Sequence, residues 1–179
     1  MKIQSLPSNL RGVYDQWKLL QQVHKLVVEH KWLECIGLAK EVSNGQENDF
    51  YGEYYQGICH TQLKFYDEAI ENFEAALLNI QKNKIQWTVT EYEQEAQLRL
   101  AHVHRLQRRY DKATELLDEL IKTHPRYANA YQSKAGIQID QKDFQGALVT
   151  ANFGLDQLPN HEELTDLRNS MVYELTAKS

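Results

Sequence analysis

The sequence predicts an all-α fold, a right-handed α-solenoid of about four helix pairs followed by a C-terminal capping helix. The 179-residue chain contains 3 Pro and 8 Gly, and 42% of its residues are hydrophobic, a composition typical of long helices rather than of sheets. An aromatic residue followed three places later by a small one recurs along the chain, with the small residues 34, 44 and 34 positions apart. The pairs are Trp32 and Cys35, Tyr66 and Ala69, Tyr110 and Ala113, and Phe144 and Ala147. A period near 34 residues indicates an array of helix-turn-helix units.

Helix boundaries follow from the punctuation of the sequence. Pro7 and Ser8 precede the first helix, and the polar residues 43–45 end the second. Asn160 and Glu163 have the spacing of a capping box and start the last helix. We expect helices at residues 10–29, 33–43, 49–63, 67–83, 88–107, 111–123, 127–141, 144–157 and 161–177. They form one predicted domain, residues 1–179, with a degenerate repeat at 10–47, repeats at 49–83, 88–125 and 127–159, and a capping helix at 161–177.

The units resemble tetratricopeptide repeats, in which a small residue on the first helix faces an Ala-x3-Phe motif on the second. The matching residues are Gly57, Tyr66, Ala69, Phe73 and Ala76 in the second unit, Leu100, Ala101, Tyr110, Ala113, Leu117 and Pro125 in the third, and Tyr131, Ala135, Phe144, Ala147 and Pro159 in the fourth. The first unit keeps Trp32 and has Val23 where Gly is expected, so it is a degenerate repeat. The resemblance covers residues 14–160 and implies that the first helix of each unit lines a concave groove.

The interval of 44 contains ten residues more than its neighbours. These residues either lengthen both flanking helices or form a short exposed loop that carries Ile85, Trp87 and Val89. In either case Trp87 projects beyond the regular stack and is a candidate contact residue. The alternative is that Trp87 packs against the extended helix ends.

Composition and motifs exclude several functional classes. The formal net charge of −5 disfavours sequence-independent binding of nucleic acid. No apolar run reaches the length of a membrane span, and the N-terminal residues lack the apolar run of a signal peptide, so we expect a cytoplasmic protein. The sequence contains no phosphate-binding loop, nucleophile elbow or metal-ligand motif, so we expect no enzyme, no cofactor and no metal site. Cys35 stands where other units have Ala and is expected to be a small buried side chain, and a disulfide with Cys59 is not expected.

The candidate partner-binding residues lie mainly on the first helices. They are Trp17, Tyr51, Tyr54, Tyr55, Trp87, Arg99, His102, Arg105 and Arg109. Tyrosine and tryptophan bury large areas and suit apolar anchors, whereas arginine binds carboxylates through paired hydrogen bonds. Arg99, His102, Arg105 and Arg109 recur at intervals of three or four residues and form one helical stripe. The alternative is a solvated face with internal ion pairs, Arg99 with Glu95 and Arg109 with Asp111 or Glu115.

These features predict a non-enzymatic protein–protein interaction module, a scaffold or adaptor that binds a partner peptide or helix in its concave groove. The partner would carry acidic residues beside an apolar or aromatic anchor. Two alternatives keep the fold. The chain could be a structural subunit of a homo-oligomer or larger assembly, with Met171, Val172 and Tyr173 meeting another copy, or it could be a peptide-sensing regulator.

Overall fold

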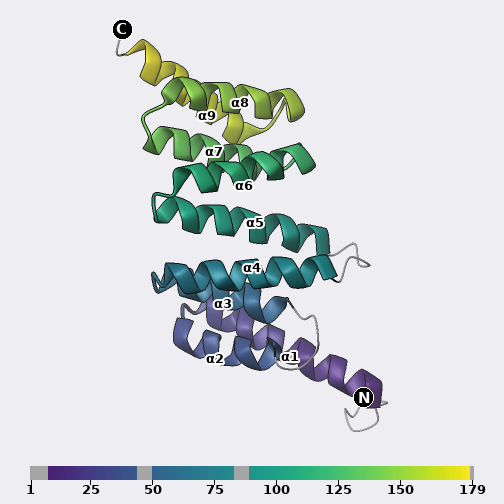
Figure 1. Ribbon diagram of the computed structural model, residues 1–179. Coiled ribbons are helices and arrows are strands. Elements are labelled where there is room, and N and C mark those ends of the chain that lie inside the picture. Colours follow the sequence, from purple (N-terminus) through teal and green to yellow (C-terminus); the bar gives the residue numbers. More distant parts are fainter. Residues whose placement is uncertain (1–7, 44–49, 83–88, 178–179) are drawn as a thin grey trace. The chain divides into compact units, whose positions relative to one another are not determined.

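The computed structural model describes residues 8–43, 50–82 and 89–177 (Figure 1). These residues form α-helices with short connections, and the described part of the chain contains no strand. The predicted all-α helical-repeat fold is therefore confirmed, and each helix with both ends described begins and ends within two residues of its expected bounds. The chain divides into two compact units, residues 1–96 and 97–179.

Unit 1 contains α1 (Ser8–Val28), α2 (Trp32–Ser43), α3 (Tyr51–Gln62), α4 (Tyr66–Lys82) and the first residues of α5 (Val89–Leu106). In this unit α1 packs against α2, α2 against α3, and α3 against α4. Small and apolar residues with no exposed surface lie between α1, α2 and α3, among them Val23, Cys35 and Cys59. The expected burial of Cys35 is confirmed.

Close packing of α3 on α4 depends on a glycine. A Cβ atom added to Gly57 would lie 2.7 Å from the ring of Phe73, which is 1% exposed. Such a distance is well inside van der Waals contact, so the absence of a side chain at Gly57 lets the aromatic ring fill the space between the helices. This contact explains why the second unit has a small residue on its first helix and a Phe in the Ala-x3-Phe motif of its second helix.

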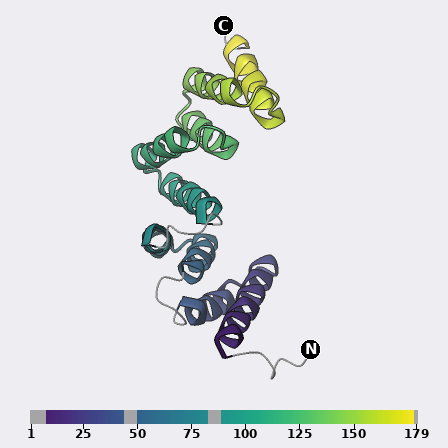
Figure 2. The same ribbon diagram turned by 90° about the vertical axis from the view of Figure 1, so that its right-hand side faces the viewer.

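Unit 2 contains the remainder of α5 and α6 (Tyr110–Thr123), α7 (Ala128–Asp140), α8 (Phe144–Gln157) and α9 (Glu162–Thr176). Ala101, Ala113 and Leu117 bring α5 and α6 together in one buried cluster. The last helix packs along α8 and also contacts α7, as Figures 1 and 2 show. It buries Leu164 and Met171 against them.

The turn inside each helix pair has the same backbone geometry. His30, Lys64, Arg108 and Lys142 have φ angles of 58, 64, 58 and 62° and are the non-glycine residues with positive φ in the described chain. In each turn the N–H of this residue donates to the carbonyl three residues earlier, and the next N–H donates to the carbonyl five residues before itself. This is the hydrogen-bond pattern of a Schellman motif, which satisfies the last carbonyls of a helix.

The long interval is accommodated partly by helix extension. The helices that flank it, α4 and α5, contain 17 and 18 residues, whereas the corresponding helices α6 and α7 contain 14 and 13. Of the two alternatives, longer flanking helices are therefore observed, and Val89 begins α5. Ile85 and Trp87 lie outside the described residues, so the expectations for their side chains stay predictions.

Candidate functional site: charged surfaces of unit 2 and aromatic residues of unit 1

The predicted aromatic anchors of unit 1 differ in exposure. Trp17 on α1 is 54% exposed, whereas Tyr54 on α3 is 5% exposed. Tyr54 and Tyr51 belong to an aromatic cluster with Phe50 and Tyr92, in which the rings of Tyr51 and Tyr54 lie 5.0 and 5.5 Å from that of Tyr92. Edge-on packing of this kind stabilises the core of unit 1. Tyr54 is therefore a core residue, and Trp17 keeps an accessible ring.

Tyr55 lies at the edge of the same cluster and is half-buried. Burial raises the pKa of its phenol, and the neighbouring Tyr92 and Tyr54 raise it further. The hydroxyl group is thus neutral at any physiological pH and acts as a hydrogen-bonding group beside an apolar ring.

The predicted arginine stripe in unit 2 follows α5 into the turn that precedes α6. Arg99 and Arg105 are partly buried, whereas His102 and Arg109 expose a larger fraction of their side chains. Partial burial lowers the pKa of His102, and the nearby charges of Arg105 and Arg99 lower it further. Arg105 and Arg99 therefore lie close enough to His102 to disfavour its charged form.

One member of the stripe is engaged within the fold. The Arg105 guanidinium donates from Nε to Asp140 Oδ2 at 2.6 Å and from Nη2 to Asp140 Oδ1 at 3.0 Å, and Nη2 also donates to the Gly136 carbonyl at 3.0 Å. Hydrogen bonding to Asp140 raises the pKa of Arg105, and the same bonds lower the pKa of Asp140. Arg105 thus fastens α5 to α7 through Nε and Nη2.

The sequence did not identify the partner of Arg105. The internal pairs considered there were local, between residues at most six positions apart, whereas Arg105 and Asp140 are separated by 35 positions. Gly136 permits their approach, since a Cβ atom at that position would lie 2.7 Å from Arg105 Nη1. A small residue one helical turn before an acidic one, on the first helix of the next unit, is the signal that could have indicated this pair.

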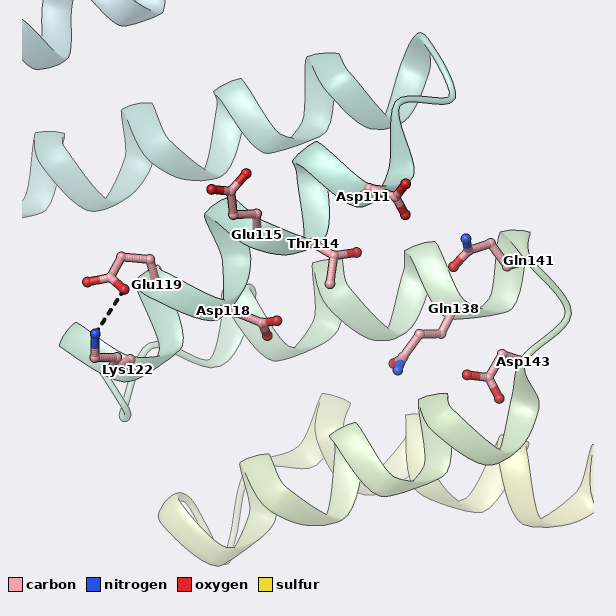
Figure 3. Close-up of a pocket in the computed structure, with 9 residues that line it drawn as sticks. All are labelled: Asp111, Thr114, Glu115, Asp118, Glu119, Lys122, Gln138, Gln141 and Asp143. Carbon is pink, nitrogen blue, oxygen red and sulfur yellow. Dashed lines mark hydrogen bonds and ion pairs between the residues drawn. The ribbon is translucent and has the colours of Figure 1, made fainter.

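A groove of about 770 Å³ lies on another face of unit 2, between α6 and the junction of α7 with α8 (Figure 3). Its lining is rich in carboxylates and contains one ammonium group. The lining residues are Asp111, Thr114, Glu115, Asp118, Glu119, Lys122, Gln138, Gln141 and Asp143. We refer to this surface as the acidic groove.

The carboxylates of the acidic groove have mostly local partners. The Nζ atom of Lys112 lies 2.8 Å from Glu115 Oε2, and that of Lys122 lies 3.1 Å from Glu119 Oε2. The Nζ atom of Lys134 lies 2.5 Å from Asp118 Oδ1. The pair with Lys112 lowers the pKa of Glu115, which is fully exposed. Exposed pairs of this type are weak because water and salt screen them, so a competing cation can replace the lysine.

A second hollow of about 480 Å³ adjoins the acidic groove. Arg108, Arg109 and Lys112 line it together with Asp111 and Gln141, and the last two residues also line the acidic groove. Unit 2 therefore presents a cationic hollow beside an anionic groove. A partner segment that covers both would need charges of opposite sign at its two ends.

Sequence reasoning missed the acidic groove because the resemblance directed attention to the first helices of the units. The signal was nevertheless present, since Asp111, Glu115, Asp118 and Glu119 recur at helical spacing along α6. Asp143 also lines the groove, although it does not belong to α6. Its side chain is held at the start of α8, where it accepts a hydrogen bond from the Gly146 N–H at 2.8 Å.

In the part of the chain that the structure describes, no group of three or more His, Cys, Asp or Glu side chains could hold a metal ion. Among the described helices, none combines the length and the apolar character needed to cross a membrane.

Comparison with known proteins identifies one repeat and the fold. A family model described as tetratricopeptide repeat matches residues 94–137. No curated protein matches the sequence. The similar solved structures include MamA from Desulfovibrio magneticus RS-1, with 17% identity, a TM-score of 0.64 and coverage of 91% of this chain and 93% of that one.

Two further structures share the fold. YrrB, described as a tetratricopeptide repeat protein with an unusual peptide-binding site, has 13% identity and a TM-score of 0.60 over 89% of this chain and 76% of its own. Cut9, from a hetero-tetramer of Cut9 and Hcn1 in the APC/C, has 18% identity and a TM-score of 0.69, but the match spans only 29% of it and 87% of this chain. At these identities the likeness is one of fold.

Proposed function

Because this chain is a tetratricopeptide repeat protein, we propose that it is a non-enzymatic interaction module of the cytoplasm that holds a basic segment of a partner protein in the acidic groove. The fold itself supports a role in protein–protein interaction. The observation that carries the more specific proposal is the hollow between α6, α7 and α8, which is lined by five carboxylates and one lysine. Its volume is within the roughly 300–1,000 Å³ of ligand sites, so several side chains of a peptide fit.

The chemistry of the groove favours lysine and arginine. Arginine binds a carboxylate through two parallel hydrogen bonds, which the exposed Asp111 and Glu115 can accept. Two of the lysines that contact groove carboxylates, Lys112 and Lys122, are held by single, exposed contacts and are replaceable. The net charge of −5 also accelerates the approach of a cationic partner. YrrB is described as having a peptide-binding site, so the fold is compatible with this type of ligand.

A second candidate surface is the basic stripe of unit 2 that the sequence indicates. The guanidinium groups of Arg99 and Arg109 favour an acidic partner segment there. Trp17 offers an apolar anchor in unit 1. In this proposal Tyr54 and Arg105 have supporting roles, since one is buried and the other is paired with Asp140.

If the chain is instead a structural subunit, fewer of the residues named for contact with another copy are accessible. Met171 is 4% exposed and packs with Ala135 and Ala147, so it contributes to the core of unit 2. Val172 and Tyr173 are 44% and 70% exposed and are the residues left to contact another copy. A role as a peptide-sensing regulator is compatible with either peptide-binding surface.

The proposal is tested with two fluorescent peptides, one of alternating Lys and Ala and one of alternating Glu and Ala. Fluorescence anisotropy at low and at physiological ionic strength measures their affinity for the full chain. We expect the lysine peptide to bind, with an affinity that falls as salt is added because the contacts are ionic.

A matched pair of variants locates the site. Asp111→Lys with Glu115→Lys reverses two charges four residues apart at the start of α6, and Glu162→Lys with Asp166→Lys makes the same change at the start of α9. We expect about a tenfold loss for the first variant and less than a twofold change for the second. Equal losses of affinity in the two variants would show that only the net charge of the protein matters, and would refute binding in the acidic groove.

Binding of the glutamate peptide instead would favour the second surface. Arg99→Glu with Arg109→Glu then abolishes binding, whereas Arg126→Glu with Arg168→Glu provides the control in the same unit. Arg105 is left unchanged in this test, because a glutamate there would face Asp140 and disturb the fold.

A further inference from the structure

Two cysteine sulfurs meet in the core of unit 1. The Cys59 thiol on α3 donates toward Cys35 Sγ on α2 at a sulfur–sulfur distance of 2.7 Å. Both cysteines are reduced, and neither has any exposed surface. A disulfide bond is about 2.05 Å long, so the sulfurs need to approach by only about 0.7 Å to become bonded.

The surroundings hold the two thiols together. Val23, Ala39 and Val42 pack around them in the same buried cluster. The contact joins two helices that follow one another in the chain, so both sulfurs belong to one compact unit. A close approach maintained by packing raises the effective concentration of one thiol at the other.

We propose that Cys35 and Cys59 form a reversible intramolecular disulfide that fastens α2 to α3 when hydrogen peroxide reaches them. The residues act as a pair, and neither has a place in the proposed peptide-binding surfaces. The inference is therefore independent of the proposed function.

The contact between the sulfurs couples the ionisation of the two thiols. Their hydrogen bond lowers the pKa of the thiol that accepts it and raises the pKa of the thiol that donates it, while burial raises both. Thiolates react with peroxide whereas thiols do not, so the thiol that ionises first is the nucleophile and the other resolves the product. With Cys35 as the nucleophile, Cys59 is the resolving thiol.

The reaction balances in two steps. The Cys35 thiolate attacks one oxygen of hydrogen peroxide, the O–O bond breaks, and the departing hydroxide takes up the proton released from Cys35 to give water and a sulfenic acid. Cys59 sulfur then attacks Cys35 Sγ, the S–O bond breaks, and the departing hydroxide takes the Cys59 proton to give a second water. Two thiols are oxidised by two electrons, and one peroxide is reduced to two waters.

Burial sets the rate of this reaction. With no exposed surface at either sulfur, peroxide reaches Cys35 only when the contact between α2 and its neighbours opens locally. Closure then brings Cys59 back to the sulfenic acid and completes the bond before a second peroxide arrives. The structure thus favours a disulfide over further oxidation of Cys35.

The test treats the purified full chain with hydrogen peroxide and separates a non-reducing digest by mass spectrometry. The expected result is a monomer that has lost two hydrogen atoms, has no titratable thiol and yields one linked pair of peptides containing Cys35 and Cys59. Dithiothreitol should restore both thiols. The cross-link closes a loop and should raise Tm by about 5–10 °C.

Cys35→Ala and Cys59→Ala serve as controls. Alanine is the residue that other units have at the position of Cys35, so the first variant retains the packing of the repeat. Neither variant should show a peroxide-dependent rise in Tm. The proposal is overturned by thiols that stay reduced in the folded chain under conditions that oxidise the urea-unfolded chain. Sulfinic acid without a cross-link, disulfide-linked dimers or an unchanged Tm after cross-linking would also overturn it.

Discussion

Arg105 and Asp140 form a two-pronged ion pair between the first helices of two successive units, with N–O distances of 2.6 and 3.0 Å. The pair lies on the face where the resemblance predicts partner contacts. Its first effect is therefore structural, because it fixes the position of α5 against α7 within unit 2.

Replacing Asp140 by Asn should destabilise the protein by about 0.5–1 kcal/mol at pH 7, because the side chains are about one-third exposed and solvent screens the pair. The pKa of Asp140 is lowered in the fold, so its contribution is present above the unfolded pKa near 4 and is lost as the pH falls through the lower folded value. Urea unfolding at pH 7 and at a series of values below pH 4 checks this. Asp156→Asn is the control, and a difference that does not shrink as the pH falls would contradict the assignment.

Lys142 occupies a left-handed backbone conformation with φ of 62° that glycine adopts without strain. Lys142→Gly should raise the free energy of unfolding by about 1 kcal/mol, while Lys142→Ala should give no gain because alanine keeps the Cβ atom. Thermal denaturation of the three proteins separates the backbone effect from loss of the lysine side chain. Equal stability of the two variants would argue against a Schellman turn at this position.

The same substitution should have opposite effects at two glycines of unit 1. Gly57→Ala should destabilise by about 1–3 kcal/mol, since the added carbon would lie 2.7 Å from the Phe73 ring. Gly37 lies inside α2, and a Cβ atom there meets nothing within 4 Å, so Gly37→Ala should stabilise by about 0.5–1 kcal/mol. Urea titrations give both signs, and a combined Gly57→Ala and Phe73→Leu protein should recover part of the loss.

His102 should make binding of an acidic peptide dependent on pH. Burial and two arginines lower its pKa, so the ring is neutral at pH 7 and gains a charge only below its ordinary range near 6.5. If the stripe on α5 binds such a peptide, its affinity should rise as the pH falls from 7 to 5. His102→Gln should remove that rise, and an unchanged profile in the variant would exclude His102 from the site.

The sequence predicted the fold well because its signals are local. Gly57 and Phe73 belong to one helix pair, and their spacing alone indicates the contact that the structure shows. The environments of Tyr54 and Arg105 depend instead on residues of later helices, Tyr92 and Asp140 respectively. The neighbouring helices determine which side of a first helix is covered, because each is rotated about its axis to a particular angle. The periodicity of the sequence does not specify that angle. The acidic stripe of α6 can be recognised from the sequence. Only the fold places Asp143 and Gln138 beside that stripe in the same groove.

The four Schellman turns are spaced 34, 44 and 34 residues apart, so they repeat the interval pattern of the sequence motif. Each turn is complete in itself, because its hydrogen bonds join residues no more than five positions apart. Additional chain therefore enters between the helix pairs and leaves the turns within them unchanged. For protein engineering, an inserted reporter or affinity tag therefore belongs between helix pairs and not within one of these turns.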